Sequence, residues 1–192
     1  MPDPYAEVTA FLLTRRSRPA KTLAPPVPDR AALRPLLQAA ARSPDHGKLE
    51  PWRFVVLERA ALLRLAALVP ETGARLGREA AEIDKARAQF DQAHLAVAVI
   101  EVQRPSAKVP PIEQSYSAGA VCLALLNAAL AAGWGANWLS GWPSHDRGFA
   151  EAALGLAEYE RIAGFIHIGT ESAAPPERPR PDLEAITTWV TA

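Results

Sequence analysis

The sequence predicts a central β-sheet with helices packed outside it, in either an α/β or an α+β arrangement. Short apolar segments of strand character alternate along the chain with longer segments of helical character, as expected of layered folds. One strand segment, 94–102, is apolar at nearly every position, which is typical of a strand buried on both faces. At 192 residues the chain is most simply one domain, 1–192, with an ordinary core.

The first part of the chain predicts two helices joined by an extended connection. Pro4 to Arg15 has the spacing of an amphipathic helix. Residues 18–28 contain four prolines and predict an extended segment. Asp29 is placed to cap a helix that runs towards Arg42, and Pro35 inside it predicts a kink or a late start.

A strand at 54–57 is followed by two helices separated by a break. The first helix is expected from Arg59 to Leu68, and Pro70 to Gly73 is expected to end it. Ala74 to Phe90 then predicts a second helix with one polar face.

The buried strand at 94–102 precedes a long apolar helix, Glu113 to Ala132. A strand near 136–139, a helix from Asp146 to Leu156 and a strand from Ala163 to Ile168 follow. The proline-rich stretch 173–181 separates a last element, Leu183 to Val190, from the body. Such an arm is expected to reach a partner subunit, with an exposed flexible tail as the alternative.

Composition and charge restrict the partners and the compartment. The 21 basic and 21 acidic side chains balance, which argues against a nucleic-acid partner but leaves room for a local phosphate pocket. The single Cys122 excludes a disulfide within the chain and favours a reducing, cytoplasmic compartment. The apolar run 118–132 ends at Gly133, too short for a membrane span of about 20 residues.

Common catalytic motifs are absent from the sequence. It has no GxGxxG after the first strand, no Walker A loop, no HExxH, no GxSxG and no cysteine pair with metal spacing. The four histidines are scattered. We therefore expect neither a metal site nor a catalytic side chain of the nucleophile or general-base kind.

What remains is a set of candidate anion-binding and ring-binding groups at the ends of elements. Arg15, Arg16 and Ser17 offer forked donors that match phosphate oxygens, although cations at a helix end also simply complement its dipole. Arg178 and Arg180 form a second compact cationic pair.

Two further segments combine donors with flat apolar side chains. Arg42 and His46 flank a Ser-Pro-Asp turn, and the loop continues to Trp52, which would add a wall suited to a planar ligand. The segment 134–141, WGANWLSG, has glycines that permit close backbone approach, or alternatively is a strand with two core tryptophans.

Together these segments resemble the nitroreductase family of FMN-dependent oxidoreductases. The resemblance runs from Arg15 to about Val190, and the loop of the form PDHxxxxPWxF at 44–54 carries most of it. It implies an α+β fold with a central mixed sheet flanked by helices and a C-terminal arm that crosses to the partner subunit. It also implies a homodimer with FMN at the interface.

The resemblance assigns roles to particular residues. Arg15, Arg16 and Ser17 would hold the FMN phosphate and ribityl chain, and Arg178 and Arg180 would complete the phosphate site. Arg42 and His46 would reach the flavin from the other subunit. The backbone of Trp138, Leu139, Ser140 and Gly141 would lie against the isoalloxazine ring.

One position departs from the family pattern. Many members carry Lys or Arg two positions after the serine, near the pyrimidine edge of the flavin, whereas this chain has Pro19. Arg18, Lys21 or Lys48 would have to compensate the charge of the reduced ring, and the sequence does not select one of them.

The activity implied by the resemblance is transfer of hydride from NAD(P)H to FMN and onward reduction of a small electron acceptor, a nitroaromatic, a quinone or a similar compound, in a ping-pong cycle. The alternatives are a flavin-binding protein without turnover, a relative that fragments FMN or dehalogenates its substrate reductively, and a domain with an empty site. The sequence does not indicate the physiological acceptor or the choice between NADH and NADPH.

Overall fold

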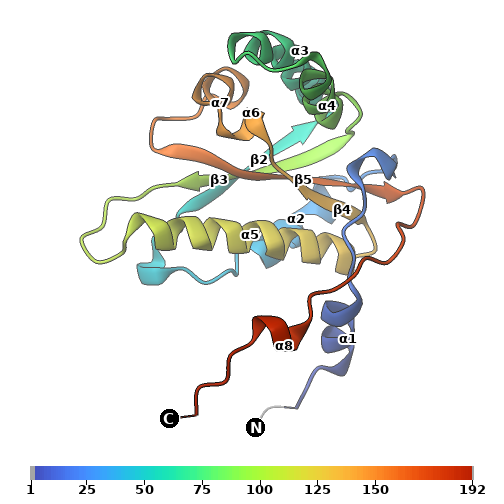
Figure 1. Ribbon diagram of the computed structural model, residues 1–192, viewed down its shortest axis with the longest axis vertical. Helices are drawn as coiled ribbons and strands as arrows, with labels where there is room; N and C mark the ends of the chain where they lie inside the picture. Colours follow the sequence, from blue (N-terminus) through green and yellow to red (C-terminus); the bar gives the residue numbers. More distant parts are fainter. Residues whose placement is uncertain (1–2, 192) are drawn as a thin grey trace.

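The computed structural model describes residues 3–191 and has three layers, a β-sheet between two layers of helices (Figure 1). Helices α2 (Arg30–Ala40) and α5 (Pro111–Ala131) cover one face of the sheet. Helices α3 (Arg59–Arg75), α4 (Ala80–Asp91) and α7 (Arg147–Leu154) cover the other. The expected α+β class with helices on both faces is confirmed.

The sheet has five strands, and each of its described ladders is antiparallel. These strands are β1 (Leu23–Ala24), β2 (Trp52–Glu58), β3 (Leu95–Val102), β4 (Gly135–Leu139) and β5 (Glu160–Glu171). Their order is β1-β5-β3-β2, and β4 also pairs with β5.

The expectation of a mixed sheet is therefore wrong, and the connections explain why. Helices α3 and α4 pack against each other as a pair and return the chain to the end of the sheet that it left after β2. Strand β3 consequently runs back along β2, from Trp52 opposite Glu101 to Glu58 opposite Leu95. The single helix α5 makes β4 run in the direction of β3, but β5 lies between these two strands.

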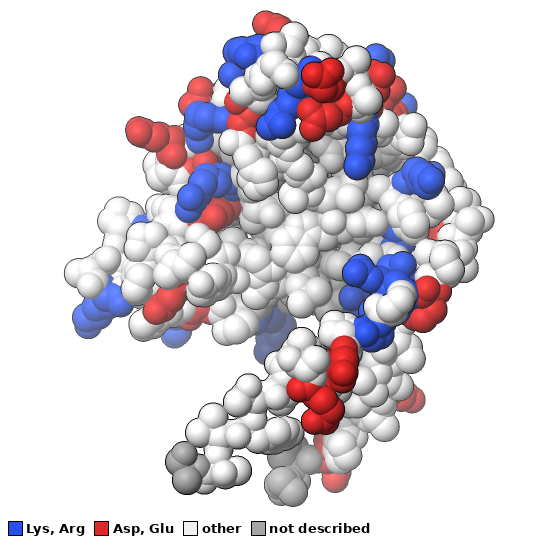
Figure 2. Space-filling view, viewed as in Figure 1, with Lys and Arg blue, Asp and Glu red and all other residues white. Residues whose placement is uncertain are grey.

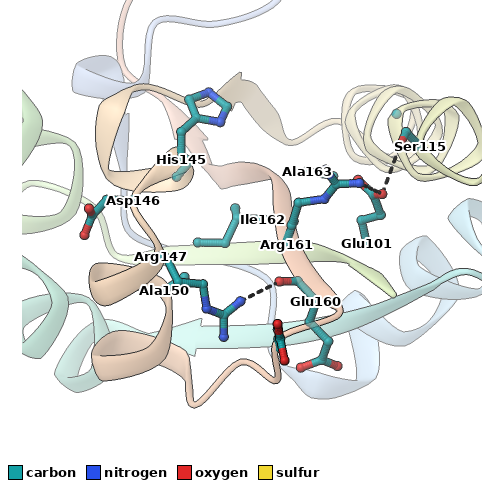
Figure 3. A pocket seen from close by; sticks show the side chains of 13 residues that line it. Glu101, Ser115, His145, Asp146, Arg147, Ala150, Glu160, Arg161, Ile162 and Ala163 are labelled. Atoms are coloured by element: carbon teal, nitrogen blue, oxygen red, sulfur yellow. Dashed lines mark hydrogen bonds and ion pairs between the residues drawn. The ribbon is translucent and has the colours of Figure 1, made fainter. Parts of the chain in front are cut away.

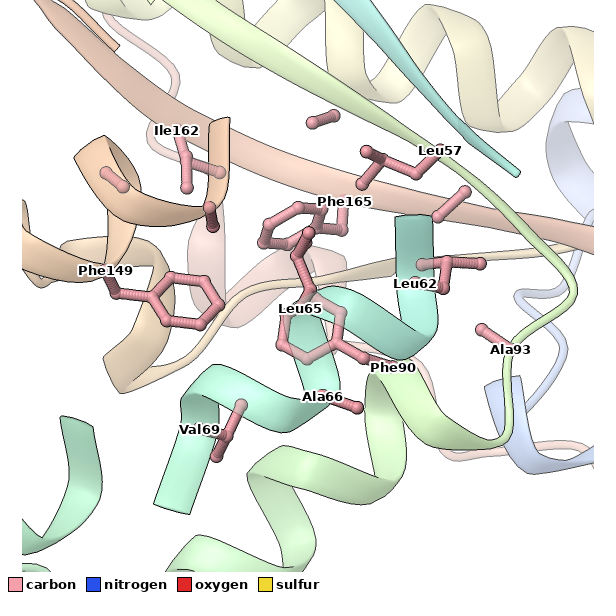
Figure 4. Packing of buried hydrophobic residues seen from close by; sticks show 14 of the residues in the cluster. Leu57, Leu62, Leu65, Ala66, Val69, Phe90, Ala93, Phe149, Ile162 and Phe165 are labelled. Carbon is pink, nitrogen blue, oxygen red and sulfur yellow. The ribbon is translucent and has the colours of Figure 1, made fainter. Parts of the chain in front are cut away.

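Strand β3 is buried on both faces, as its sequence predicted. Its side chains alternate, so that Leu95, Val97 and Val99 pack towards α2 and α5. Ala96, Ala98 and Ile100 join the opposite cluster under α3, α4 and α7. Figure 4 shows members of that cluster, among them Phe90, Phe149 and Phe165.

Three phenylalanines form the centre of that second cluster. Phe90 of α4 lies 5.8 Å from Phe149 of α7 and 5.1 Å from Phe165 of β5, measured between ring centroids. All three rings are fully buried, and each such ring contributes about 1.5–3 kcal/mol of transfer free energy. They fix α4 and α7 to the sheet.

Neither Pro35 nor Pro70 sets a helix boundary. Helix α2 begins at Arg30, directly after the Asp29 cap, so the late start suggested by Pro35 is not seen. Helix α3 runs through Pro70, and the predicted break there is wrong. Burial of Val69 and Gly73 holds this stretch against the core, and Gly73 packs so closely on Ile83 of α4 that an added Cβ would lie 2.5 Å from it.

Helix α5 is the one helix in residues 3–191 whose length and hydropathy would suit a membrane span. Its side chains Val121, Cys122 and Leu125 are fully buried against the sheet and α2, as expected of a core helix. Its outward face is apolar as well, and exposes Tyr116 and Leu123.

Two arms leave the body at one end and run beside each other (Figure 1). The first is α1 (Ala6–Thr14), none of whose residues is buried. The second is the C-terminal tail with α8 (Leu183–Ile186), shorter than the element expected at 183–190. Both arms present apolar side chains to solvent, and Leu13, Trp189 and Val190 are 77%, 82% and 85% exposed.

Candidate functional site

The segment after α1 is fixed beside the start of β4. The backbone N–H of Arg18 donates to the carbonyl of Ala136 at 2.8 Å, and the Asn137 amide donates to the carbonyl of Arg18 at 2.7 Å. These two bonds join Arg18 to residues 118 and 119 positions later in the chain, so residues 15–18 are brought to β4, the strand that ends at Leu139.

Arginines from both arms converge there. Burial lowers the pKa of Arg15, and the charges of Arg180, Arg16 and Arg18 lower it further. The Arg15 guanidinium donates to Ser17 Oγ at 2.9 Å, and an Arg16 nitrogen lies 3.5 Å from the carbonyl of Pro176. Figure 2 shows basic side chains gathered where the arms leave the body, whereas the face over α5 carries few charges.

Some hydrogen-bond donors of this cluster have no partner within the described residues. Arg18 pairs with Glu171 at 3.0 Å, and Arg180 pairs with Glu177 at 2.8 Å. The Nε atoms of Arg15 and Arg16 are buried without a partner within the described residues. Buried donors beside surplus positive charge make this cluster a candidate anion-binding site.

A hollow of about 660 Å³ opens near the same segment. It is lined by Leu139, Ser140 and Gly141 at the end of β4, and by Pro19 and Lys21 after the cluster. Gly141 has φ of 142°, a conformation that favours glycine, and it turns the chain from β4 into α6 (Trp142–His145).

The neighbouring Trp138 does not line this hollow. Because side chains alternate along a strand, Trp138 points to the other face of β4, where its indole lies against Gly164. Of the four residues predicted at 138–141, Leu139, Ser140 and Gly141 therefore border the hollow. The side chain of Trp138 lies on the other face of the strand.

The opposite wall of the hollow comes from α4, and sequence reasoning missed it. Glu82, Lys85 and Gln89 recur every three or four residues and face the hollow, while Ala86 and Phe90 anchor the helix in the core. The signal was the polar face already visible in 74–90, but nothing local showed that it would meet the end of β4.

Arg42 and His46 do not lie at the arginine cluster or the hollow, but near the beginning of α5. His46 begins a short 3-10 turn, η2 (His46–Lys48), and its Nδ1 lies 2.7 Å from a carboxylate oxygen of Glu113 in the first turn of α5. Ser117 Oγ donates to the carbonyl of Pro44 and fixes the loop to the same end of that helix. Arg42 is exposed just before this loop.

The two sets of candidate residues therefore lie at opposite ends of α5. The helix has 21 residues, a length of about 30 Å, and Ala136 next to Arg18 follows its far end. One chain thus brings together Arg15, Arg16, Ser17 and Arg180, but it does not bring Arg42 and His46 to them. Arg178 lies two positions from Arg180, and only its backbone N–H has a described bond, to Glu177.

The loop tryptophan also differs from its expected role. Trp52 Nε1 donates to Ser117 Oγ at 3.2 Å, and its ring packs against Phe54 and the cluster under α2 and α5. Within one chain it is a packing residue and does not wall the hollow.

A second hollow, of about 520 Å³, lies between the first half of α5 and α7 (Figure 3). Its buried carboxylates are already neutralised. Arg161 and Ser115 donate to Glu101 at 2.6 and 2.9 Å, and Arg53 binds both carboxylate oxygens of Glu160 at 2.6 and 2.9 Å. The pKa of Glu160 is lowered chiefly by its bond to Arg53, so this group is a poor proton donor.

The fold is of the α+β class, and the arginine cluster beside the hollow is a candidate anion-binding site. The sequence profile of the Nitroreductase family matches residues 12–170, and the chain belongs to this family. The resemblance noted from the sequence is confirmed.

Named relatives agree with the assignment. "Putative NAD(P)H nitroreductase YdjA" of Escherichia coli K12 is 36% identical over 160 residues, which cover 83% of this chain and 86% of that protein. A protein of Haemophilus influenzae named "Putative NAD(P)H nitroreductase" is 33% identical over 165 residues, covering 85% and 88%.

Solved structures show the same fold. A nitroreductase-like family protein from Bacillus cereus has a TM-score of 0.79 at 22% identity and covers 99% of both chains. A Desulfovibrio desulfuricans protein, described as a "putative nitroreductase in complex with FMN", has a TM-score of 0.75 at 20% identity and covers both chains fully.

Proposed function

We propose that this protein is an FMN-dependent oxidoreductase that takes hydride from NAD(P)H and reduces a small electron-poor acceptor. Nitroaromatics and quinones are the acceptor class, and the cycle is of the ping-pong type. The observation that carries the proposal is the cluster of Arg15, Arg16 and Arg180 next to a hollow bordered by Leu139 to Gly141. Family membership and the names of the two relatives support it.

The residues present fit an FMN. Arg15, Arg16 and Ser17 would bind the phosphate together with Arg180 and Arg178, because a dianion would satisfy the two unpartnered Nε atoms and relieve the repulsion among the arginines. The hollow is bordered by backbone on one side and by α4 on the other, and would take the flat ring.

The division of labour follows from this chemistry. FMN bound at this site would supply the redox chemistry, transfer of two electrons as a hydride from the nicotinamide and then to the acceptor. The protein is then required to bind, orient and tune the ring. This agrees with a hollow whose charged residues, Lys21, Glu82 and Lys85, are suited to electrostatic tuning.

The proposal includes a homodimer with the cofactor at the interface. Apolar side chains on α1, on the tail and on the outward face of α5 are exposed in the single chain and form a surface suited to a second copy. Since Arg42 and His46 lie at the far end of α5, they would serve the partner's flavin rather than their own. The C-terminal arm would cross to the partner, and the enzyme would work in the cytoplasm, where NAD(P)H is available.

The test is an absorption spectrum of the purified protein, followed by addition of NADH or NADPH without oxygen. The expected result is a flavin spectrum whose visible band disappears on addition of the nicotinamide and returns with a nitroaromatic or quinone. A persistent band indicates a flavin-binding protein without turnover, and a colourless protein that does not take up FMN contradicts the proposal. Product analysis distinguishes simple reduction from FMN fragmentation or dehalogenation.

A further inference from the structure

The proposed function leaves open which charged side chain of the hollow compensates the charge of the reduced ring. The lining of the hollow includes two lysines, Lys21 and Lys85, and one carboxylate, Glu82. The Glu82 carboxylate lies 3.9 Å from a nitrogen of Arg78 outside this set. The hollow therefore has a net positive lining.

The other cations near the N-terminal segment are already engaged or distant. The Arg18 side chain pairs with Glu171 at 3.0 Å, and its backbone is held by Ala136 and Asn137. Lys48 is in the η2 turn, beside the first turn of α5. Within residues 3–191, Lys21 and Lys85 have no carboxylate at ion-pairing distance.

The two lysines differ in how firmly they are held. Lys21 is in a three-residue 3-10 turn, none of whose residues is buried. Lys85 is on α4, next to the buried Ala86, and the helix is fixed by Phe90 in the core and by the contact of Ile83 with Gly73. A charge on a fixed element keeps its distance to a bound ring and therefore acts as a preorganised electrostatic group.

We propose that Lys85, supplied by α4, is the cation that compensates the negative charge of the reduced flavin ring, in place of the side chain that Pro19 lacks. The inference rests on the proposed function. Uptake of a hydride, two electrons and one proton, gives the ring one additional negative charge, and a nearby ammonium stabilises that form over the oxidised one. Lys85 therefore raises the reduction potential of the bound cofactor.

The chain has four lysines, Lys21, Lys48, Lys85 and Lys108, so single Lys→Gln substitutions form a complete set in which each variant loses one charge. The midpoint potential of the bound FMN is measured for each protein. We expect a lower potential for Lys85→Gln, a smaller decrease for Lys21→Gln, and values close to the unsubstituted protein for Lys48→Gln, Lys108→Gln and Lys85→Arg. In Lys85→Gln, the pH at which the reduced flavin takes up a proton should also rise.

Equal potentials for Lys85→Gln and Lys108→Gln would overturn the inference, as would a larger decrease in Lys21→Gln. Lys85 is exposed, so its substitution should leave the melting temperature unchanged and flavin bound. If the unsubstituted protein binds no FMN, the proposed function itself has failed. If it binds FMN that NAD(P)H reduces, but Lys85→Gln leaves the potential unchanged, only the role of Lys85 is wrong.

Discussion

The indole of Trp138 occupies the space that a side chain on Gly164 would need: a Cβ at Gly164 would lie 2.0 Å from Trp138 Nε1. Gly164→Ala should push the indole outwards and lower the free energy of unfolding by about 1–3 kcal/mol. Near-UV circular dichroism would report the moved tryptophan. In the double variant Gly164→Ala/Trp138→Ala, the losses in free energy of unfolding should be strongly non-additive, because the clash disappears when the indole is removed.

Gly119 supplies the control for this prediction. It is inside α5, and an added Cβ would meet nothing within 4 Å. Gly119→Ala should stabilise the helix by about 0.5–1 kcal/mol and leave the tryptophan signal unchanged. An unchanged signal in Gly164→Ala would contradict the close contact.

The buried His167 should lower the free energy of unfolding in mild acid. Its ring is 1% exposed, neither ring nitrogen has a partner in the described residues, and burial lowers its pKa from 6.5 to about 4. Below pH 6.5 the unfolded chain binds a proton that the folded chain refuses, so stability falls with pH until about pH 4. The total loss is about 3 kcal/mol.

Denaturant unfolding at several pH values would test this. His167→Leu should reduce the slope of stability against pH between 6.5 and 4, whereas replacement of the exposed His145 should not. Identical slopes for the His167 variant and the unsubstituted protein would show that the histidine does not carry the effect.

Arg15→Ala should weaken FMN binding by about 1.5–3 kcal/mol, a factor of roughly 10 to 100, because a charge-assisted bond to the phosphate is lost. Fluorescence titration with FMN measures the dissociation constant. Arg34→Ala, which removes an exposed arginine from α2, is the matched control. Equal affinities in the two variants would remove Arg15 from the site.

Leu123→Lys should dissociate the proposed dimer, because it places a charge on the exposed apolar face of α5. Leu63→Lys on α3 is the matched control. Leu123 and Leu63 are 45% and 42% exposed, and they lie on opposite sides of the sheet. Sedimentation analysis should show monomers for Leu123→Lys only. A dimer in both variants would move the interface away from α5.

Mixed dimers test whether two chains share one site. Arg15→Ala and His46→Ala proteins should each bind FMN weakly. If His46 serves the partner's flavin, a mixed dimer has one site with both residues intact, and mixing the unfolded proteins before refolding should restore about half of the FMN in those dimers. Should both residues act within one chain, mixing restores nothing.

The sequence predicted the elements better than their ends or their direction. The apolar run 94–102 identified β3 because burial on both faces leaves a local pattern. Pro70 misled because a proline marks a helix end only where packing permits, and Gly73 against Ile83 holds α3 together beyond it. The direction of the strands depends on the α3–α4 pair, which no single segment encodes.

In the candidate site, too, local motifs could be predicted from the sequence, whereas their arrangement in space could not. Arg15 to Ser17 and Leu139 to Gly141 were found as separate motifs, and the bonds of Arg18 to Ala136 and Asn137 bring them together. Lys85 was not found because a lysine on an exposed helical face looks the same whether it borders a ligand or water. Only the structure shows that α4 lies opposite the end of β4 and that Lys85 therefore borders the hollow.

The exposed arms have a consequence for the life of the protein. The single chain presents Trp189, Val190 and Leu13 to water, and surfaces of this kind promote aggregation unless a partner such as the proposed second copy covers them. If the proposed dimer shares its flavin sites between chains, retention of FMN should decline on dilution, since the binding groups would separate along with the subunits.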